Sequence, residues 1–186
     1  MTEAEFLALV KQNPLNAAIL ERLPELQRVA PEAHLVAGSL FGTVWNVQTG
    51  RPPTENIKDY DLFYWHPDTS YAAEDAVIQY AAQLFADLDA PIEVRNQARV
   101  HLWFNQKHGL NRPPLQSARE GIDQFLVECT CLGIDARSEV YAPYGLADMA
   151  AGRLKLNELN HSPTLYAAKV QSYQARWPWL VAVSGE

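Results

Sequence analysis

Cysteine is scarce in this 186-residue sequence: it contains only Cys129 and Cys131, two residues apart. Their segment is typical of a strand, where side chains two residues apart point the same way and are poorly placed for a disulfide. With no other cysteine, neither a disulfide framework nor a zinc-finger spacing is available. A reducing compartment, the cytoplasm, is therefore the expected setting.

Long apolar runs are also absent, although 48 % of the residues are hydrophobic. No stretch approaches the roughly 20 apolar residues that cross a bilayer. The first residues, MTEAEFLALVKQ, are acidic and helical in pattern rather than a basic leader before an apolar stretch. We therefore expect no membrane association and no secretion signal, and the apolar content is sufficient for one buried core.

Basic residues are few, with 15 Lys and Arg against 22 Asp and Glu, and the formal net charge is −7. Proteins that bind long nucleic acids use clustered Lys and Arg to displace counterions from phosphates. The charge therefore argues against a long nucleic acid as partner, although a local basic pocket stays open as an interpretation. The P-loop and the nucleophile elbow are missing too, which excludes two large classes of enzyme.

Hydrophobic periodicity, capping residues and turn residues predict a mixture of helices and strands. Helices are expected from a capping box at Thr2 and Glu5, from Asn13-Pro14, over 39–46, from Ser70, from Ser117, and over about 145–151 and 163–176. Strands are expected over 34–38, 59–65, 91–94 and 100–104, whereas residues 125–132 fit a strand or the end of a helix. This order predicts an α+β (α/β-like) domain with a small sheet covered by helices.

Two aspartates, Asp59 and Asp61, stand in an otherwise apolar predicted strand. Residues i and i+2 of a strand project from the same face, about 6.5–7 Å apart along the chain. Mg2+ prefers a few carboxylates together with substrate phosphate oxygens, and paired metal ions activate an attacking oxygen and neutralise a leaving pyrophosphate. The alternative is the solvent-facing side of an edge strand, and the Asp-x-Asp spacing alone does not choose between the two.

A glycine and a serine connect the first predicted strand to the helix that follows it. Gly38 and Ser39 place backbone N–H groups and a hydroxyl at a helix N-terminus, where phosphate binds favourably and glycine allows close approach. An ordinary glycine turn with a serine cap explains the same two residues. Followed along the chain by the Asp59 and Asp61 strand, the turn forms part of a constellation that indicates nucleotide binding.

Together these motifs resemble the polymerase-β-like nucleotidyltransferase superfamily, in which a Gly-Ser turn and helix precede an Asp-x-Asp strand and a third carboxylate on a later strand. The segments HLVAGSLFGTVWN, IKDYDLFYWHPD and IEVRNQARVHLWF are more narrowly similar to a group of small, uncharacterised bacterial nucleotidyltransferase-family proteins. The resemblance covers about residues 34–146, with a weaker echo in YAAKVQSYQARWPWL. One departure is the gap from Gly38 to Asp59, which is longer than in many superfamily members and which the narrower group shares.

The resemblance implies a nucleotidyltransferase fold, a short mixed β-sheet flanked by helices with additional N- and C-terminal helices. It places N-terminal helices in 1–30, the catalytic core in 34–146 and a C-terminal helical segment in 147–186 of one domain over 1–186.

The resemblance also implies Mg2+-dependent transfer of a nucleoside monophosphate, with Mn2+ as an alternative ion. Asp59, Asp61 and Glu93 would be the metal-binding and catalytic carboxylates. Glu93 lies near the start of a predicted strand, where it would bind the catalytic metal or accept the proton of the acceptor hydroxyl. The alternative for Glu93 is a residue at the rim of the sheet.

The segment after Glu93 is unusually polar for its place between apolar strands. Arg95 and Arg99 are candidates for binding a triphosphate, because guanidinium groups match phosphate oxygens. Asn96 and His101 are candidates for contacts with base, ribose or acceptor. For each residue singly, a hydrogen-bonded connection with solvated arginines is an equally good interpretation. Residues expected to be plain surface are Lys58, Lys169 and Arg176, and those expected in the core rather than stacking on a base are Trp45, Trp65 and Trp103.

The predicted function is transfer of a nucleotidyl group from an NTP to a hydroxyl, with Gly38 and Ser39 holding the β- and γ-phosphates. Because the chain is acidic, the expected acceptor is a small molecule or a protein side chain. One alternative is a non-catalytic nucleotide-binding or regulatory module, and another is a carboxylate–metal hydrolase of phosphoesters.

Overall fold

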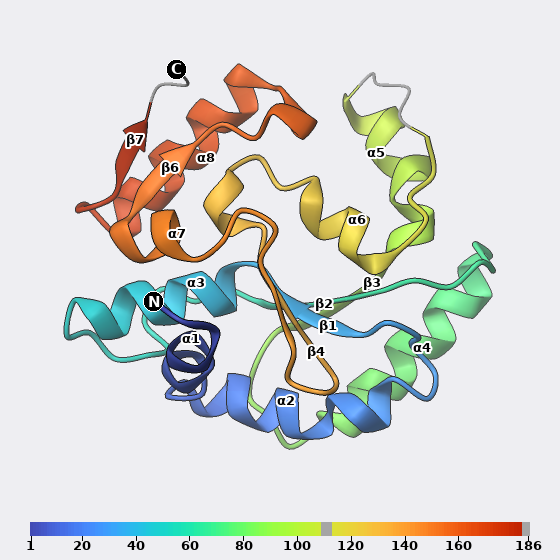
Figure 1. Ribbon diagram of the computed structural model, residues 1–186. Helices are drawn as coiled ribbons and strands as arrows, with labels where there is room; N and C mark the ends of the chain where they lie inside the picture. The colour runs from blue at the N-terminus through green and yellow to red at the C-terminus, as the bar shows by residue number, and fades with distance from the viewer. Residues whose placement is uncertain (109–112, 184–186) are drawn as a thin grey trace.

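A five-stranded sheet with helices on both sides forms the centre of the protein (Figure 1). The computed structural model describes residues 1–108 and 113–183. The strands are β1 (His34–Val36), β2 (Tyr60–Tyr64), β3 (Ile92–Asn96), β4 (Gly133–Asp135) and β5 (Val140–Tyr141). Their order is β3-β2-β1-β4-β5; β2 and β3 run parallel and the other neighbours antiparallel. The predicted α+β class with a short mixed sheet is thus confirmed.

Most of the predicted helices form where their capping residues indicated. The α-helices of the described residues are α1 (Glu3–Val10), α2 (Pro14–Leu26), α3 (Gly38–Gln48), α4 (Tyr71–Leu84), α5 (Val100–His108), α6 (Ala118–Asp123), α7 (Ala147–Ala151) and α8 (Pro163–Arg176). Thr2 and Glu5 form the capping box of α1, and Asn13 caps α2 through its side chain. Ser70 and Ser117 cap α4 and α6 in the same way. None of these helices is long and apolar enough to cross a membrane.

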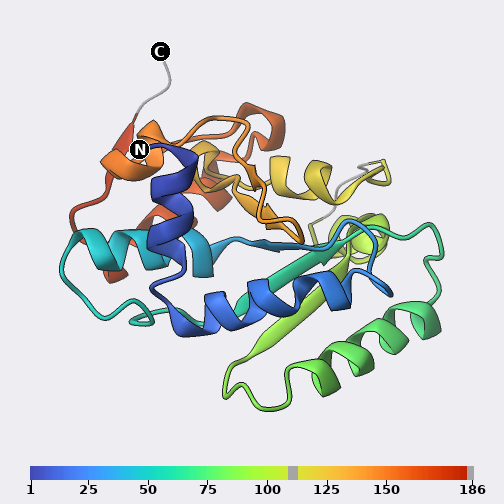
Figure 2. The same cartoon turned by 60° about the horizontal axis from the view of Figure 1, so that its bottom comes forward.

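The two faces of the sheet differ because β2 alternates between buried and half-buried residues. Tyr60, Leu62 and Tyr64 belong to the main hydrophobic core, on the side that α2 and α4 cover (Figure 2). Asp61 and Phe63 project from the opposite face, where Phe63 packs on a second, smaller core around Val36. That second face carries the candidate residues Asp61 and Glu93.

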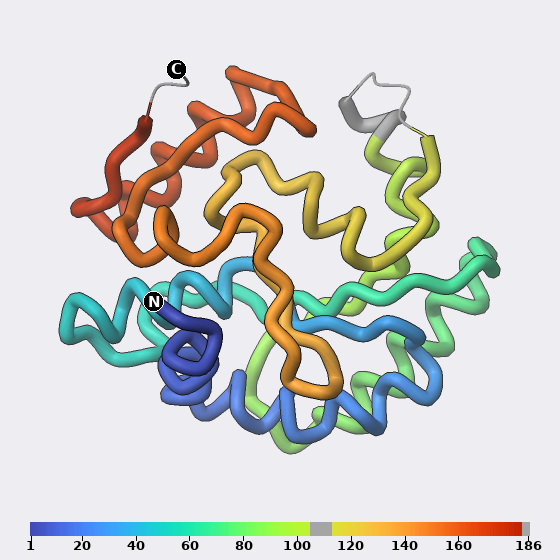
Figure 3. Tube along the Cα trace, viewed as in Figure 1, coloured from blue at the N-terminus to red at the C-terminus, as the bar shows by residue number. Residues whose placement is uncertain are grey.

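The chain after the sheet folds over this second face and is less helical than expected for 147–186. It contains the 3-10 helix η3 (Glu158–Asn160) and a separate pair of parallel strands, β6 (Arg153–Lys155) and β7 (Val181–Val183), beside α7 and α8. A further 3-10 helix, η2 (Glu128–Thr130), precedes β4. The β4–β5 hairpin bends the other way, toward α2 (Figure 3). Trp177, at the end of α8, packs edge-on against Trp45 of α3 and donates a hydrogen bond of 2.7 Å to Asn46. These contacts hold the C-terminal elements beside α3.

Two local predictions were wrong. Residues 100–104 form part of α5 rather than a strand, because the buried Asn96 side chain accepts a hydrogen bond from the N–H of Ala98 and begins the 3-10 helix η1 (Gln97–Arg99), which leads into α5. Cys129 lies in η2 rather than in a strand. Both cysteines are free, as expected, and burial raises the pKa of each thiol to about 12.

Candidate active site

The predicted metal-binding aspartates lie at the start of β2, on the face opposite the main core. Asp59 directly precedes the strand and Asp61 is its second residue; both are partly buried. The pairing of β2 with β1 sets Asp61 beside Val36, two residues before Gly38 at the start of α3. The Asp-x-Asp segment and the Gly-Ser turn, 20 residues apart in sequence, are therefore neighbours in the sheet.

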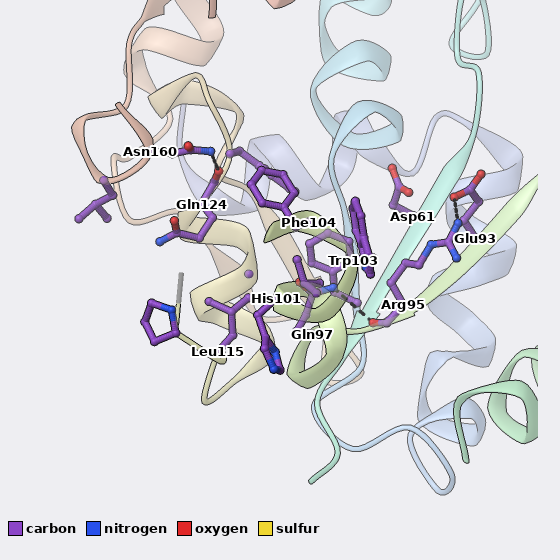
Figure 4. A pocket seen from close by; sticks show the side chains of 16 residues that line it. Asp61, Glu93, Arg95, Gln97, His101, Trp103, Phe104, Leu115, Gln124 and Asn160 are labelled. Atoms are coloured by element: carbon purple, nitrogen blue, oxygen red, sulfur yellow. Dashed lines mark hydrogen bonds and ion pairs between the residues drawn. The ribbon is translucent and has the colours of Figure 1, made fainter. Parts of the chain in front are cut away.

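Glu93 lies on the other side of the aspartate strand. In the parallel pairing of β2 with β3, Asp61 is in register with Glu93. Glu93 is about half exposed and forms an ion pair of 2.9 Å with Arg95, which is two residues along the same strand (Figure 4). Arg95 thus neutralises the third carboxylate while both side chains remain open to solvent.

The three carboxylates influence one another electrically. The pKa of Asp61 is raised to about 7, chiefly because burial removes water from its carboxylate and then because Asp59 and Glu93 repel its negative charge. Lys169 and Arg95 oppose this rise by attraction. A cation bound between the acids would remove the repulsion. Positive charge close to Asp61 therefore favours the ionised form of its carboxylate.

The arrangement of the acids decides how they could hold a divalent metal ion. In the part of the chain that the structure describes, no three His, Cys, Asp or Glu side chains are arranged to enclose a metal. Glu93 faces Arg95, so the three predicted ligands are not brought together as one set. Mg2+ does not need such a cage, because one or two carboxylates plus phosphate oxygens suffice. The crowded Asp59–Asp61 pair fits this manner of binding.

The Gly-Ser turn has an unusual backbone. Ala37, the residue before α3, has φ 61° and ψ −138°, a conformation that L-residues rarely adopt and that costs about 1–3 kcal/mol. A β-carbon at Gly38 would meet no atom within 4 Å, so open space adjoins the helix N-terminus there. Ser39 differs from the prediction: its side chain is fully buried, and its Oγ has no hydrogen-bond partner. The turn therefore offers Gly38, rather than the Ser39 hydroxyl, to a phosphate.

Two residues of the polar segment serve the fold instead of the site. Arg99 forms an ion pair of 3.0 Å with Glu74 of α4 and donates to the carbonyl of Ser70. The buried Asn96 side chain accepts from the N–H of His66 and caps η1. These placements do not support the predicted contacts of Arg99 with phosphate or of Asn96 with substrate.

Two cations of α8, predicted as plain surface, also act electrostatically on the aspartates. Lys169 is accessible to solvent, yet surrounding protein atoms and Arg176 lower the pKa of its ammonium group, while Asp61 and Asp59 act in the opposite direction. Desolvation also lowers the pKa of Arg176, and Tyr173 and then Asp59 oppose this effect by attraction. Only the packing of α8 over the sheet brings these charges together, so no local sequence signal could have identified them.

A cavity of about 800 Å³ has Asp61 and Glu93 in its lining (Figure 4). Its lining is mostly apolar and aromatic and comes from β2, β3, α5, α6 and η3. His101 lines it, as the prediction of a substrate contact requires, and its Nδ1 is buried without a hydrogen-bond partner. Trp103 was expected in the core; it is 48 % exposed and lines the cavity instead.

Comparison with known proteins agrees with this geometry. The chain is similar to an NMR structure described as revealing a CCA-adding enzyme head domain, with 23 % sequence identity, a TM-score of 0.77, and coverage of 98 % of this chain and 96 % of that one. The likeness defines the class of fold, that of a nucleotidyltransferase head domain. A family model described as nucleotidyltransferase matches residues 27–182, and the chain belongs to that family. No curated protein matches the sequence. The predicted superfamily and enzyme class are thereby confirmed.

Proposed function

We propose that the chain transfers a nucleoside monophosphate from an NTP to a hydroxyl group of a small molecule or a protein side chain. The observation that carries this proposal is the spatial order of the candidate groups across three adjacent strands. The open Gly38 turn follows β1, Asp61 belongs to β2 with Asp59 directly before it, and Glu93 lies beside Asp61 on β3. In this order, the Gly38 turn would bind the triphosphate, the aspartates would bind a metal ion, and Glu93 would contact the acceptor.

On the phosphate side, the N-terminus of α3 at Gly38 would bind the β- and γ-phosphates, since its first N–H groups lack partners within the helix. Lys169 and Arg176 would add positive charge there, and Ser39 would contribute through its backbone rather than its buried hydroxyl. Mg2+, or Mn2+ in its place, would be held by Asp59 and Asp61 and would neutralise the phosphate oxygens and the leaving pyrophosphate.

On the acceptor side, Glu93 would accept the proton of the attacking hydroxyl. The acceptor oxygen would form a bond to the α-phosphorus while the bond from that phosphorus to the bridging oxygen breaks and pyrophosphate leaves with the electron pair. Arg95 would keep Glu93 oriented and charged through the ion pair. Catalysis would then come mainly from positioning and from neutralisation of charge.

The test is Mg2+-dependent release of pyrophosphate from each of the four NTPs, with and without a pooled metabolite extract. Asp59→Asn and Asp61→Asn should abolish the release. Asp75→Asn, the same chemical change on α4 at the opposite face, should leave it unchanged. Release that requires the extract and the two aspartates supports the proposal.

Other results would select an alternative. Nucleotide binding without any release of pyrophosphate favours a regulatory module. Release of phosphate or nucleoside monophosphate without an acceptor favours a phosphoesterase.

A further inference from the structure

The position of the cavity relative to Asp61 and Glu93 indicates which reactant it could hold. Gly38 follows β1, Asp61 is on the neighbouring strand β2 and Glu93 is on β3; the cavity is lined by residues of β2 and β3 and, among the described residues, by none of β1. In phosphoryl transfer the attacking and leaving oxygens are roughly in line across the reacting phosphorus. If pyrophosphate leaves toward Gly38, the attacking hydroxyl must approach from the Glu93 side, which is the side of the cavity.

The charged side chains that line the cavity do not favour binding of a phosphate group. Among its described lining residues, the charged side chains are Asp61, Glu93 and Arg95, and His101 is the one further titratable group. Arg95 is occupied by its ion pair with Glu93. Phosphates need cations that are free to pair with them. The cavity therefore suits a ligand that is uncharged or positively charged.

The volume and the lining of the cavity suit a planar, partly apolar molecule. Its volume of about 800 Å³ is within the range of small-molecule sites. The rings of Trp103 and Phe104, with centroids 5.7 Å apart, line it from α5. On the sheet side, Phe63 meets Phe125 edge-on, also at 5.7 Å. Such rings stack on planar groups.

Polar groups in the wall would orient such a molecule. Gln97 is 2 % exposed and donates a hydrogen bond of 3.3 Å to the carbonyl of Arg95. It fits because residue 121 is glycine: a β-carbon there would collide with the Gln97 amide. A buried amide at a cavity wall can select a ligand with a matching hydrogen-bonding group.

We propose that this cavity is the acceptor site, and that the acceptor is a small, uncharged or cationic molecule with a planar ring and a hydroxyl group. The hydroxyl lies at Glu93 and the ring stacks near Trp103. The inference rests on the proposed nucleotidyl transfer. It excludes two other occupants, the base of the NTP and a phosphorylated acceptor such as an RNA end.

The experiment uses the full chain and a half-exposed residue whose loss the fold tolerates. Trp103→Ala removes one ring of the cavity, and Leu102→Ala is the matched control, because Leu102 is 51 % exposed on the same helix and does not line the cavity. An ultrafiltered metabolite extract is divided by anion exchange into a retained and an unretained fraction. Nucleotide affinity is measured separately, by titration with each Mg·NTP.

The acceptor activity should be in the unretained fraction. Trp103→Ala should raise the amount of that fraction needed for half-maximal pyrophosphate release about tenfold, the effect of losing one aromatic stacking contact. Its nucleotide affinity should stay within about twofold of wild type, and Leu102→Ala should match wild type throughout. Gly121→Ala, which displaces the Gln97 amide, should impair acceptor use in the same selective way.

Three results would overturn the assignment. They are acceptor activity found only in the retained fraction, a loss of nucleotide affinity in Trp103→Ala, and no effect of Trp103→Ala on either quantity. Failure of the underlying function is distinct from these: wild type would release no pyrophosphate, or Asp59→Asn would release as much as wild type.

Discussion

The replacement Asp61→Asn should abolish activity while making the metal-free protein more stable. Asp61 is partly buried and lies near two other carboxylates, and its pKa in the fold is about 7. Asparagine has nearly the same shape and carries no charge. The substitution therefore removes the repulsion from Asp59 and Glu93 together with the cost of desolvating a carboxylate.

Proton linkage gives the direction in which Asp61 changes the stability of the fold with pH. Because the pKa of Asp61 is higher in the fold than the 3.8 of an unperturbed aspartate, the folded state binds more protons than the unfolded state between these values. Stability therefore falls as pH rises through this window and reaches its lowest contribution above about pH 7. The full difference corresponds to about 4 kcal/mol at about 1.36 kcal/mol per pH unit. Relaxation and water penetration reduce it, so about 2–4 kcal/mol is expected.

The assay is urea unfolding of wild type and Asp61→Asn in a chelator, at about pH 5 and about pH 8, on either side of the folded pKa. The variant should be more stable at the higher pH, and its advantage should shrink at the lower pH, disappearing only below about pH 4, where Asp61 is protonated in both states. Adding Mg2+ should stabilise wild type more than the variant, because only a ligand bound to the folded state shifts the equilibrium. Asp75→Asn should follow wild type in every condition.

An Asp61→Asn protein that is less stable than wild type at the higher pH would refute the reasoning. The crowding of the acids would then not be costly, and the case for a cation at this point would lose its main physical support. A gain of stability with loss of activity would show, in contrast, that the variant is inactive for a chemical reason and not because it fails to fold.

Three further predictions concern other parts of the molecule. Burial is the main cause of the lowered pKa of His34, so this residue binds a proton more readily in the unfolded chain. The contribution of His34 to stability is therefore fully present above about pH 6.5 and is lost as pH drops below it. His34→Gln should flatten this pH dependence of stability in urea unfolding, and the control His161→Gln, at an exposed site, should not. Equal pH profiles for His34→Gln and wild type would contradict the role given to His34. Glu74→Gln leaves Arg99 without its ion-pair partner, at a site where the Arg99 side chain is 17 % exposed and that of Glu74 is 15 % exposed. The substitution should lower the free energy of unfolding, measured by chemical denaturation, by about 2–4 kcal/mol. A change near zero would show that the ion pair contributes little to stability. Lys169→Met should raise the dissociation constant of Mg·NTP about tenfold without changing stability, and an unchanged constant would remove Lys169 from the phosphate site.

Local sequence was sufficient for the features that depend on neighbouring residues. Asn13, Ser70 and Ser117 cap their helices because a side chain reaches N–H groups two or three residues ahead. The alternation in β2 likewise places Asp61 on the face opposite Leu62 whatever the rest of the fold does. The candidate aspartates and the glycine turn could therefore be found without coordinates.

The segment after β3 shows where local patterns fail. Its apolar, β-branched and aromatic residues favour a strand over 100–104, but the Asn96 side chain caps a turn that starts a helix, and Trp103 is left half exposed. Propensity is a weak preference, and here the local cap formed by Asn96 overrides it. The expectation that Trp103 is buried failed for the same reason.

Sequence alone determined the family, the capped helices and the pair of aspartates, because each is a property of short segments. Only the tertiary structure decided which distant groups meet those aspartates. Strand pairing set Glu93 in register beside Asp61, and the packing of α8 brought Lys169 near them, across more than 100 residues of sequence. Arg99, equally plausible from its position, was drawn instead to Glu74. Charge interactions act through space, so a site built from several elements is complete only when those elements pack.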